Sequence, residues 1–158
     1  MVHVTKQQKG DIFSVKLAGS IEESVDFMTL IGMPSSNRME VNCKEVARIN
    51  SMGVKAWMKF FQNVYQKGVA VRFVECSTAV VELMNMISNF ACGGTVESLY
   101  VPYVCRDCKK ELLGLYRVAD LKKLAFKVPD LSCPKCQGTA SFDDNLNEYF
   151  GFLAGQKR

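Results

Sequence analysis

The sequence of 158 residues contains a single histidine, His3. A zinc helix with two histidines is excluded by this count. Catalytic triads with a histidine base and histidine proton shuttles are not expected either, because the one histidine lies close to a terminus, where a chain is often loosely held. No apolar run approaches the length of about eighteen residues that a membrane-spanning helix needs. The first residues also lack a basic start followed by an apolar run, so we expect neither a signal peptide nor a membrane span.

The net charge is also small. The formal net charge is only +4, whereas a nucleic-acid-binding protein typically presents a strongly basic face. Hydrophobic residues make up 48% of the chain and charged residues 23%, which is typical of a globular protein. Cysteine, in contrast, is plentiful: there are seven. An odd number without an export signal favours a reducing, cytoplasmic compartment, where paired cysteines are more often metal ligands than disulfides.

The first part of the chain, residues 1–102, alternates strand and helix patterns. We expect strands at 13–17, 39–43, 69–74 and 95–101, with Pro102 ending the last of them. A weak helix is expected over 22–31, and a long amphipathic helix should end near Gly68. A further helix follows Ser77, its expected N-cap. The pattern predicts an α/β fold with a mixed, largely parallel sheet flanked by helices.

In the second part, residues 103–158, cysteine pairs replace the helical pattern. Cys105 and Cys108 form one C-x-x-C pair, and Cys133 and Cys136 form another, with twenty-four residues between them. A two-residue spacer lets both thiolates of a turn face one ion, and two such turns complete a tetrahedron. The spacing predicts a small zinc-ribbon appendage with a structural Zn²⁺, because four protein ligands leave no open position for substrate. Two redox dithiols or a rubredoxin-type iron site are the alternatives.

Other features of the second part are less specific. Lys109 and Lys110, together with Lys122 and Lys123, could form a basic patch, but the ribbon carries only about +1 once four thiolates bind one Zn²⁺. A short helix is expected over 141–153, with its aromatic residues either packed on the body of the protein or presented to a partner. The three other cysteines should be buried residues without a nucleophilic role: Cys43, Cys76 and Cys92.

The sharpest functional pattern is Asn50-Ser51-Met52-Gly53, which opens the long helix after a strand and a loop. Free backbone N–H groups and the helix dipole favour an anion at such a position, so a phosphate on Ser51 would be accommodated there. Alternatively, Ser51 serves only as the N-cap.

With these residues in view, the chain resembles a STAS domain of the anti-sigma factor antagonist type over about residues 10–102. The resemblance is carried by VKLAGSIEES, INSMGVKAW, VRFVECS and STAVVELMNMI. In regulatory members of that family, the serine that aligns with Ser51 is phosphorylated by a kinase that is also the anti-sigma factor, and Gly53 matches a family glycine. Asn50 replaces the usual aspartate and Met52 the second hydroxyl residue.

The resemblance implies a non-enzymatic regulatory module that binds a protein partner, such as a serine kinase or anti-sigma factor, through Asn50, Ser51, Met52 and Gly53. Two alternatives remain open. One is a nucleic-acid or transcription-complex adaptor that acts through the zinc ribbon, with nucleic acid disfavoured by the small charge surplus. The other is a structural or assembly protein that forms homo-oligomers within a signalling complex.

Overall fold

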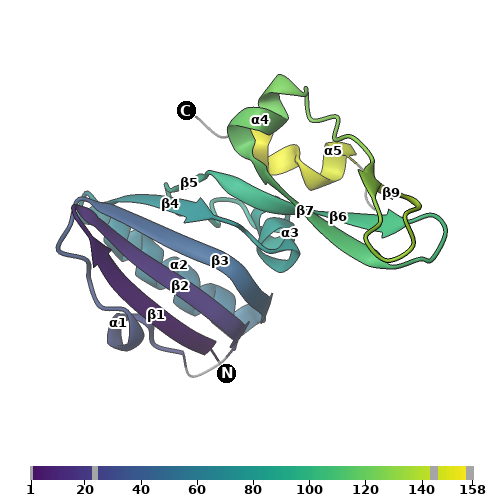
Figure 1. Cartoon of the computed structure of the whole chain (residues 1–158). Coiled ribbons are helices and arrows are strands. Elements are labelled where there is room, and N and C mark those ends of the chain that lie inside the picture. Colours follow the sequence, from purple (N-terminus) through teal and green to yellow (C-terminus); the bar gives the residue numbers. More distant parts are fainter. Residues whose placement is uncertain (1, 23–24, 143–145, 156–158) are drawn as a thin grey trace.

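The computed structural model describes residues 2–22, 25–142 and 146–155 and shows a mixed α/β fold (Figure 1). The strands are β1 Val2–Lys9, β2 Ile12–Ile21, β3 Arg38–Ile49, β4 Ala70–Val74, β5 Thr95–Val96, β6 Ser98–Cys105, β7 Glu111–Arg117, β8 Leu131–Ser132 and β9 Thr139–Phe142. The helices are α1 Phe27–Leu30, α2 Ser51–Gln66, α3 Thr78–Met86, α4 Val118–Lys123 and α5 Leu146–Tyr149, followed by the 3-10 helix η1 Gly151–Gly155. None of the described helices has the length and apolar content that crossing a membrane requires.

The first sheet has the strand order β1-β2-β3-β4-β5. Strand β1 is antiparallel to β2, whereas the other neighbours are parallel, so the sheet is mixed as the sequence predicts. The long helices α2 and α3 cover one face of this sheet and leave the opposite face open (Figure 1). Their periods and ends agree with expectation: the Ser77 hydroxyl accepts a hydrogen bond from the Val80 N–H at the start of α3, and Gly68 has φ +80° just after α2.

The core under α2 is built around Trp57, which is fully buried. Its ring stacks on Phe90 and Phe73, with centroids 4.8 and 5.4 Å away, and its Nε1–H donates to the Phe90 carbonyl at 2.9 Å. The hydrogen bond satisfies the only polar atom of the side chain, so the ring can be buried without an unpaired donor.

Four elements of the first part differ from expectation. The strand expected over 95–101 is divided at Glu97 between β5 and β6, which belong to different sheets. Strand β1 was not predicted, and β3 continues to Ile49 instead of ending near Cys43, since register shifts against β2 keep the two strands paired to their ends. The expected helix over 22–31 is reduced to α1, which Asp26 caps by accepting from the Met28 N–H at 3.1 Å; residues 23 and 24 of that expectation lie outside the described part of the chain.

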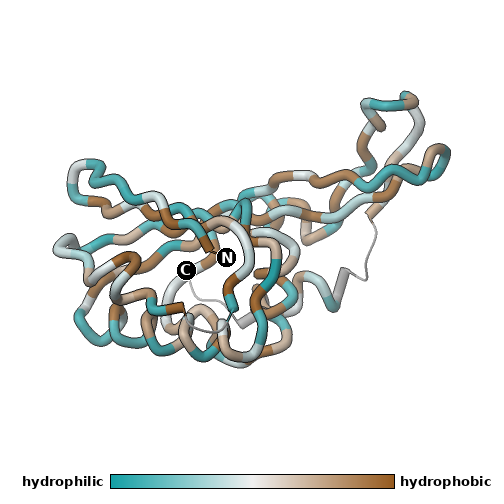
Figure 2. The backbone as a smooth tube through the Cα atoms, turned by 90° about the horizontal axis from the view of Figure 1, so that it is seen from below, coloured by the Kyte–Doolittle hydropathy of each residue, from teal (hydrophilic) through white to brown (hydrophobic). Residues whose placement is uncertain are grey.

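A second sheet, ordered β7-β6-β9-β8, extends from the first as an arm (Figure 2). Strand β6 crosses residue 102, and Pro102 lies inside it rather than ending a strand. Hydrogen-bond geometry explains this exception. The Tyr100 N–H points away from β7, to the Cys76 carbonyl at 2.9 Å, so the Pro102 nitrogen faces the same way. Pairing with β9 begins only at Tyr103, so no partner strand needs a donor at Pro102.

The end of the chain also departs from the sequence-based expectation. Ser141 belongs to β9, and the expected helix over 141–153 is divided between the single turn of α5 and η1; residues 143–145 are outside the described ranges. Three apolar side chains of this segment are buried, as expected for packing on the body of the protein: Tyr149, Phe150 and Leu153. Phe152 is partly buried. Asn85 of α3 holds the segment, donating to the Tyr149 carbonyl and accepting from the Phe152 N–H, both at 2.8 Å.

Candidate metal centre and the start of α2

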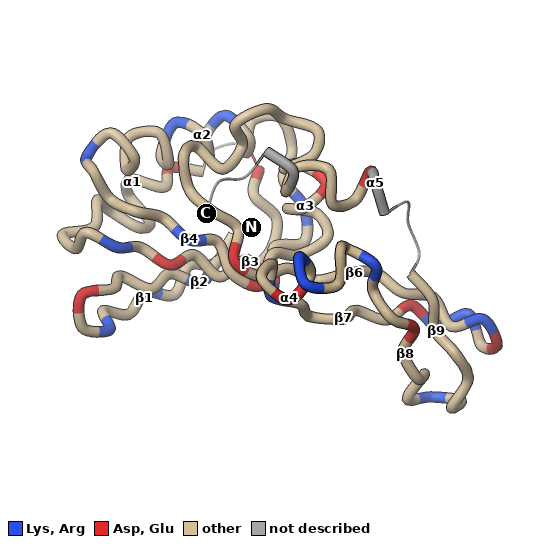
Figure 3. The backbone as a smooth tube through the Cα atoms, turned by 90° about the horizontal axis from the view of Figure 1, so that it is seen from above, with Lys and Arg blue, Asp and Glu red and all other residues tan. Residues whose placement is uncertain are grey.

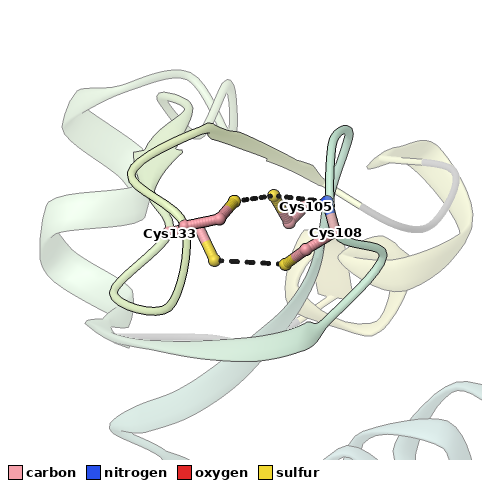
Figure 4. Close-up of side chains that lie close together, drawn as sticks. Cys105, Cys108 and Cys133 are labelled. Carbon is pink, nitrogen blue, oxygen red and sulfur yellow. Dashed lines mark hydrogen bonds between the residues drawn. The ribbon is translucent and has the colours of Figure 1, made fainter.

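Two turns at the far end of the second sheet bring the four paired cysteines together. Cys105 ends β6, Cys108 lies in the turn that follows, and Cys133 and Cys136 occupy the turn between β8 and β9. Because β6 and β9 are neighbours, with Cys105 opposite Ala140, the two turns face each other. Figure 4 shows the sulfur atoms of this cluster pointing inward toward one point.

The sulfur spacing fits one shared metal ion. The Sγ atoms of Cys105 and Cys136 lie 3.4 Å apart and those of Cys108 and Cys133 lie 3.6 Å apart, and all four sulfurs are within 4.8 Å of one another. Sulfurs bound tetrahedrally at about 2.3 Å from a zinc ion would be separated by about 3.8 Å, whereas a disulfide requires about 2.05 Å. The four cysteines predicted as ligands therefore form a cluster able to bind a metal ion.

Backbone N–H groups stabilise the thiolate form of two of these cysteines, and thiolates are the form that binds a cation. The Cys108 N–H donates to the Cys105 sulfur at 3.5 Å and lowers the pKa of that thiol to about 6. The Cys136 N–H likewise lowers the pKa of Cys133. At Cys136 the Gly138 N–H also favours the thiolate, but hydrogen bonding to Cys105 and the other thiols outweighs it and raises the pKa to about 12. Thus the metal-free cluster retains protons that a bound ion would displace.

The sequence indicates the four clustered cysteines but not the backbone groups that hold them in place. The Cys105 N–H donates to the Lys110 carbonyl at 2.9 Å, and the Cys133 N–H donates to the Gly138 carbonyl at 2.8 Å. Lys110 and Gly138 each lie five residues after the first cysteine of their pair. This equal spacing is the signal in the sequence that could have indicated these two hydrogen bonds. With four protein sulfurs around one point, such a site is closed and suits a structural role.

The lysines considered for a basic patch lie in two separate places. Lys122 and Lys123 end α4, whereas Lys109 and Lys110 lie in the turn between β6 and β7, at the opposite end of the second sheet (Figure 3). In that turn, the Lys109 ammonium donates to the Arg106 carbonyl at 2.9 Å. These four lysines therefore do not combine into one basic surface.

The remaining cysteines are buried, as the sequence predicts. Hydrogen bonding to Cys76 and burial raise the pKa of the Cys43 thiol well above its usual range. Burial raises the pKa of Cys92 to about 11. Both groups are therefore protonated at neutral pH, and a thiol is a poor nucleophile compared with a thiolate.

The four candidate residues at the start of α2, Asn50–Gly53, fall into two pairs. Asn50 is the N-cap, because its Oδ1 accepts from the Gly53 N–H at 2.9 Å, and its own N–H donates to the Ile21 carbonyl at 3.1 Å. Gly53 is buried, and a Cβ at this position would collide with the Ile21 carbonyl oxygen. Asn50 and Gly53 therefore position the helix, and the alternative that Ser51 is the N-cap is wrong.

Ser51 and Met52 form the exposed pair. Met52 is 50% exposed, and the Ser51 hydroxyl makes no hydrogen bond within the described part of the chain. Farther along, α2 carries Lys55 and Lys59 but no acidic residue, so its outer surface is basic (Figure 3). The start of α2 thus brings together an exposed hydroxyl, an apolar side chain and positive charge.

Comparison with known proteins identified no relative of this chain. No protein-family model matches the chain, and no curated protein matches it. The chemistry of these two sites therefore has to be interpreted from their own residues.

Proposed function

We propose that this chain is a non-catalytic regulatory module of STAS-like fold that binds a protein partner through the start of α2, and that its four cysteines hold a structural Zn²⁺. One observation carries the first half of the proposal. Because Asn50 caps α2, the exposed Ser51 hydroxyl is left without a hydrogen-bond partner among the described residues and is available for modification.

The choice of zinc rests on the ligand chemistry. Four soft thiolates around one point suit tetrahedral Zn²⁺, and a redox-inactive ion fits a closed site with no room for substrate. The ion would tie the β6–β7 turn to the β8–β9 turn. Since β8 has only two residues, such a tie would supply much of the stability of this hairpin.

Phosphorylation of Ser51 would act on the partner rather than on the fold. A phosphate adds close to two negative charges, and the N-terminus of α2 and Lys55, one helical turn away, both favour it. The helix therefore tolerates the modification. An acidic and partly apolar partner surface, complementary to Lys55 and Met52, would instead be repelled by the new charge. The resemblance to the STAS family makes a cytoplasmic serine kinase that is also an anti-sigma factor the expected partner.

The test begins with the protein purified from its native cell. Mass spectrometry identifies co-purifying proteins and measures the mass of the peptide that contains Ser51. Binding of the identified partner is then compared between the wild type, Ser51→Ala and Ser51→Asp. We expect Ser51→Ala to bind like the wild type and Ser51→Asp to bind at least tenfold more weakly, about 1.4 kcal/mol.

Ser88→Asp provides the matched control, because Ser88 is also exposed but follows α3 instead of opening α2. This control should leave partner affinity unchanged. Equal affinity of Ser51→Asp and the wild type, or an equal loss in Ser88→Asp, would contradict the proposed partner surface.

A further inference from the structure

Strand β7 of the second sheet pairs with β6 on one side. It lies at the edge of the β7-β6-β9-β8 sheet, and within the described residues no strand pairs with its outer side. Unpaired backbone donors and acceptors along a sheet edge are a template for another strand.

The other sheet edges carry features that discourage pairing. Strands β5 and β8 have two residues each, and β1 carries Lys6 and Lys9. Strand β7 has seven residues, and its interior, Leu112–Tyr116, contains neither a charged residue nor proline. Short strands, edge lysines and prolines are the usual protection of an edge, so β7 is the exception in this fold.

The direction of the backbone groups of β7 follows from its pairing with β6. The Val118 N–H donates to the Glu97 carbonyl at 2.8 Å, and the Cys105 N–H donates to the Lys110 carbonyl at 2.9 Å. Because hydrogen-bonded and non-hydrogen-bonded pairs alternate in an antiparallel ladder, Leu112, Gly114 and Tyr116 bond to β6. The four intervening residues direct their N–H and C=O groups outward: Glu111, Leu113, Leu115 and Arg117.

These outward residues are self-complementary about Gly114. If a second β7 runs antiparallel with Gly114 opposite Gly114, Leu113 faces Leu115 of the second copy and Glu111 faces Arg117 of the second copy. All four positions then become hydrogen-bonded pairs, in agreement with the direction of their backbone groups. Leu113 is 60% exposed and Leu115 49%, so the pairing also covers apolar surface. A shift by two residues to either side loses the pairing of Glu111 with Arg117.

We propose that β7 is a homodimerisation edge, which pairs antiparallel with β7 of a second copy about Gly114 and joins the two second sheets into one continuous sheet. The contact is small, so the dimer should form in a concentration-dependent equilibrium rather than as a permanent assembly. The proposal is independent of the Ser51 surface, which lies on the first sheet's side of the molecule at the start of α2.

Charge exchange tests the register. Sedimentation of the full-length, zinc-loaded chain is measured over a wide range of protein concentration for the wild type, Glu111→Arg and Arg117→Glu. Each variant places like charges opposite each other at both ends of the contact and should dimerise at least about tenfold more weakly. An equimolar mixture of the two variants restores opposite charges at both ends and should form mixed dimers several-fold more tightly than either variant pairs with itself. The recovery should be incomplete, because Arg117→Glu also removes the ion pair of Arg117 with Asp120 of its own chain.

Two further variants complete the experiment. Leu113→Lys should weaken dimerisation without touching either charged residue, because it places charge in the apolar centre of the contact. Glu82→Arg makes the same charge change as Glu111→Arg on the exposed surface of α3 and should have no effect. A wild type that stays monomeric at every concentration, or a mixture that dimerises no more tightly than either variant alone, would overturn the proposal.

Discussion

Lys109 and Gln137 occupy equivalent positions in the two metal-binding turns. Both have the left-handed backbone conformation, with φ of 64° and 66°, and each donates its N–H to the carbonyl of the first cysteine of its pair, at 3.1 Å to Cys105 and 2.9 Å to Cys133. The turns are thus closed by hydrogen bonds that do not involve the metal. A site whose ligand turns are already formed loses less conformational entropy when the ion binds.

The first prediction concerns the loss of one ligand. Cys133→Ser should reduce metal affinity by more than about a hundredfold and make residues 124–142 sensitive to protease, because the two-residue β8 offers little support. Trp57 fluorescence should not change, since that side chain is buried among Phe61, Phe73 and Phe90. Metal content by mass spectrometry and limited proteolysis are the measurements. Cys92→Ser, which removes a cysteine outside the cluster, should keep its metal.

The second prediction concerns pH. With a pKa of about 12, Cys136 holds its proton at neutral pH in the metal-free protein, whereas Cys105, at about 6, is mostly ionised. Zinc must therefore displace at least one proton, so its apparent affinity should fall as pH falls, by about tenfold per pH unit for each proton released. Calorimetry in buffers of different protonation enthalpy measures the number released. Zinc uptake without proton release would contradict this description of the cluster.

The third prediction concerns the contact between α2 and β2. Gly53→Ala should lower the free energy of unfolding by about 2–4 kcal/mol, because its Cβ would collide with the Ile21 backbone and force the helix outward. Gly10→Ala is the matched control: Gly10 has φ +62° but open space around it, so only the conformational cost of about 1–2 kcal/mol applies. Urea unfolding followed by Trp57 fluorescence measures both. A larger loss in the control would refute the steric explanation.

The fourth prediction separates the cap from the free hydroxyl. Asn50→Ala should lower the free energy of unfolding by about 1 kcal/mol, because the Gly53 N–H loses its acceptor. Ser51→Ala should leave stability unchanged within about 0.5 kcal/mol, since the hydroxyl bonds to nothing within the described residues. The same urea titration distinguishes the two. A destabilised Ser51→Ala would show that Ser51 shares in capping.

The fifth prediction concerns the end of the chain. Asn85→Ala removes the hydrogen bonds to the Tyr149 carbonyl and the Phe152 N–H, and should destabilise the docking of this segment by about 1–3 kcal/mol. Hydrogen exchange at the Phe152 amide should accelerate accordingly, while exchange in the core of α2 stays slow. Gln62→Ala, an exposed change on α2, should alter neither. Unchanged exchange in Asn85→Ala would mean that the other contacts of the segment, its aromatic packing and the hydrogen bond from the Tyr149 hydroxyl to the Tyr100 carbonyl, hold it without Asn85.

Buried, periodic elements of this fold were predictable because their side chains have to match the core. The stripe that includes Trp57, Phe61 and Val64 identified α2, and all three residues are buried. Fixed spacing was equally informative at the cysteines, where two residues between ligands already define a metal-binding turn. Thus α2, α3 and the four clustered sulfurs followed from the sequence.

Elements fixed by pairing rather than by burial were not predictable. From Thr5 to Lys9 strand β1 is exposed on both faces, so it shows no alternation, and its ladder with β2 alone makes it a strand. Pro102 indicated a strand end, because proline cannot donate a backbone hydrogen bond. The sequence could not show that its nitrogen faces the side of β6 where pairing with β9 has not yet begun. The N-cap was missed for a similar reason. Asn and Ser are both good caps, and only the three-dimensional contact of Asn50 with Gly53 chooses between them.

The shared strand β6 has a consequence for how this protein could be divided or recombined. It begins beside Cys76 of the first part of the chain and ends at Cys105, one of the four clustered cysteines of the second. A cut after residue 102 would separate Leu99 from Tyr103, which are buried on the same strand. The two cysteine-bearing turns are therefore not a separable unit. A recombinant that exchanges them with another protein would have to carry β6 from Ser98 onward, together with the surface of Cys76 that receives it.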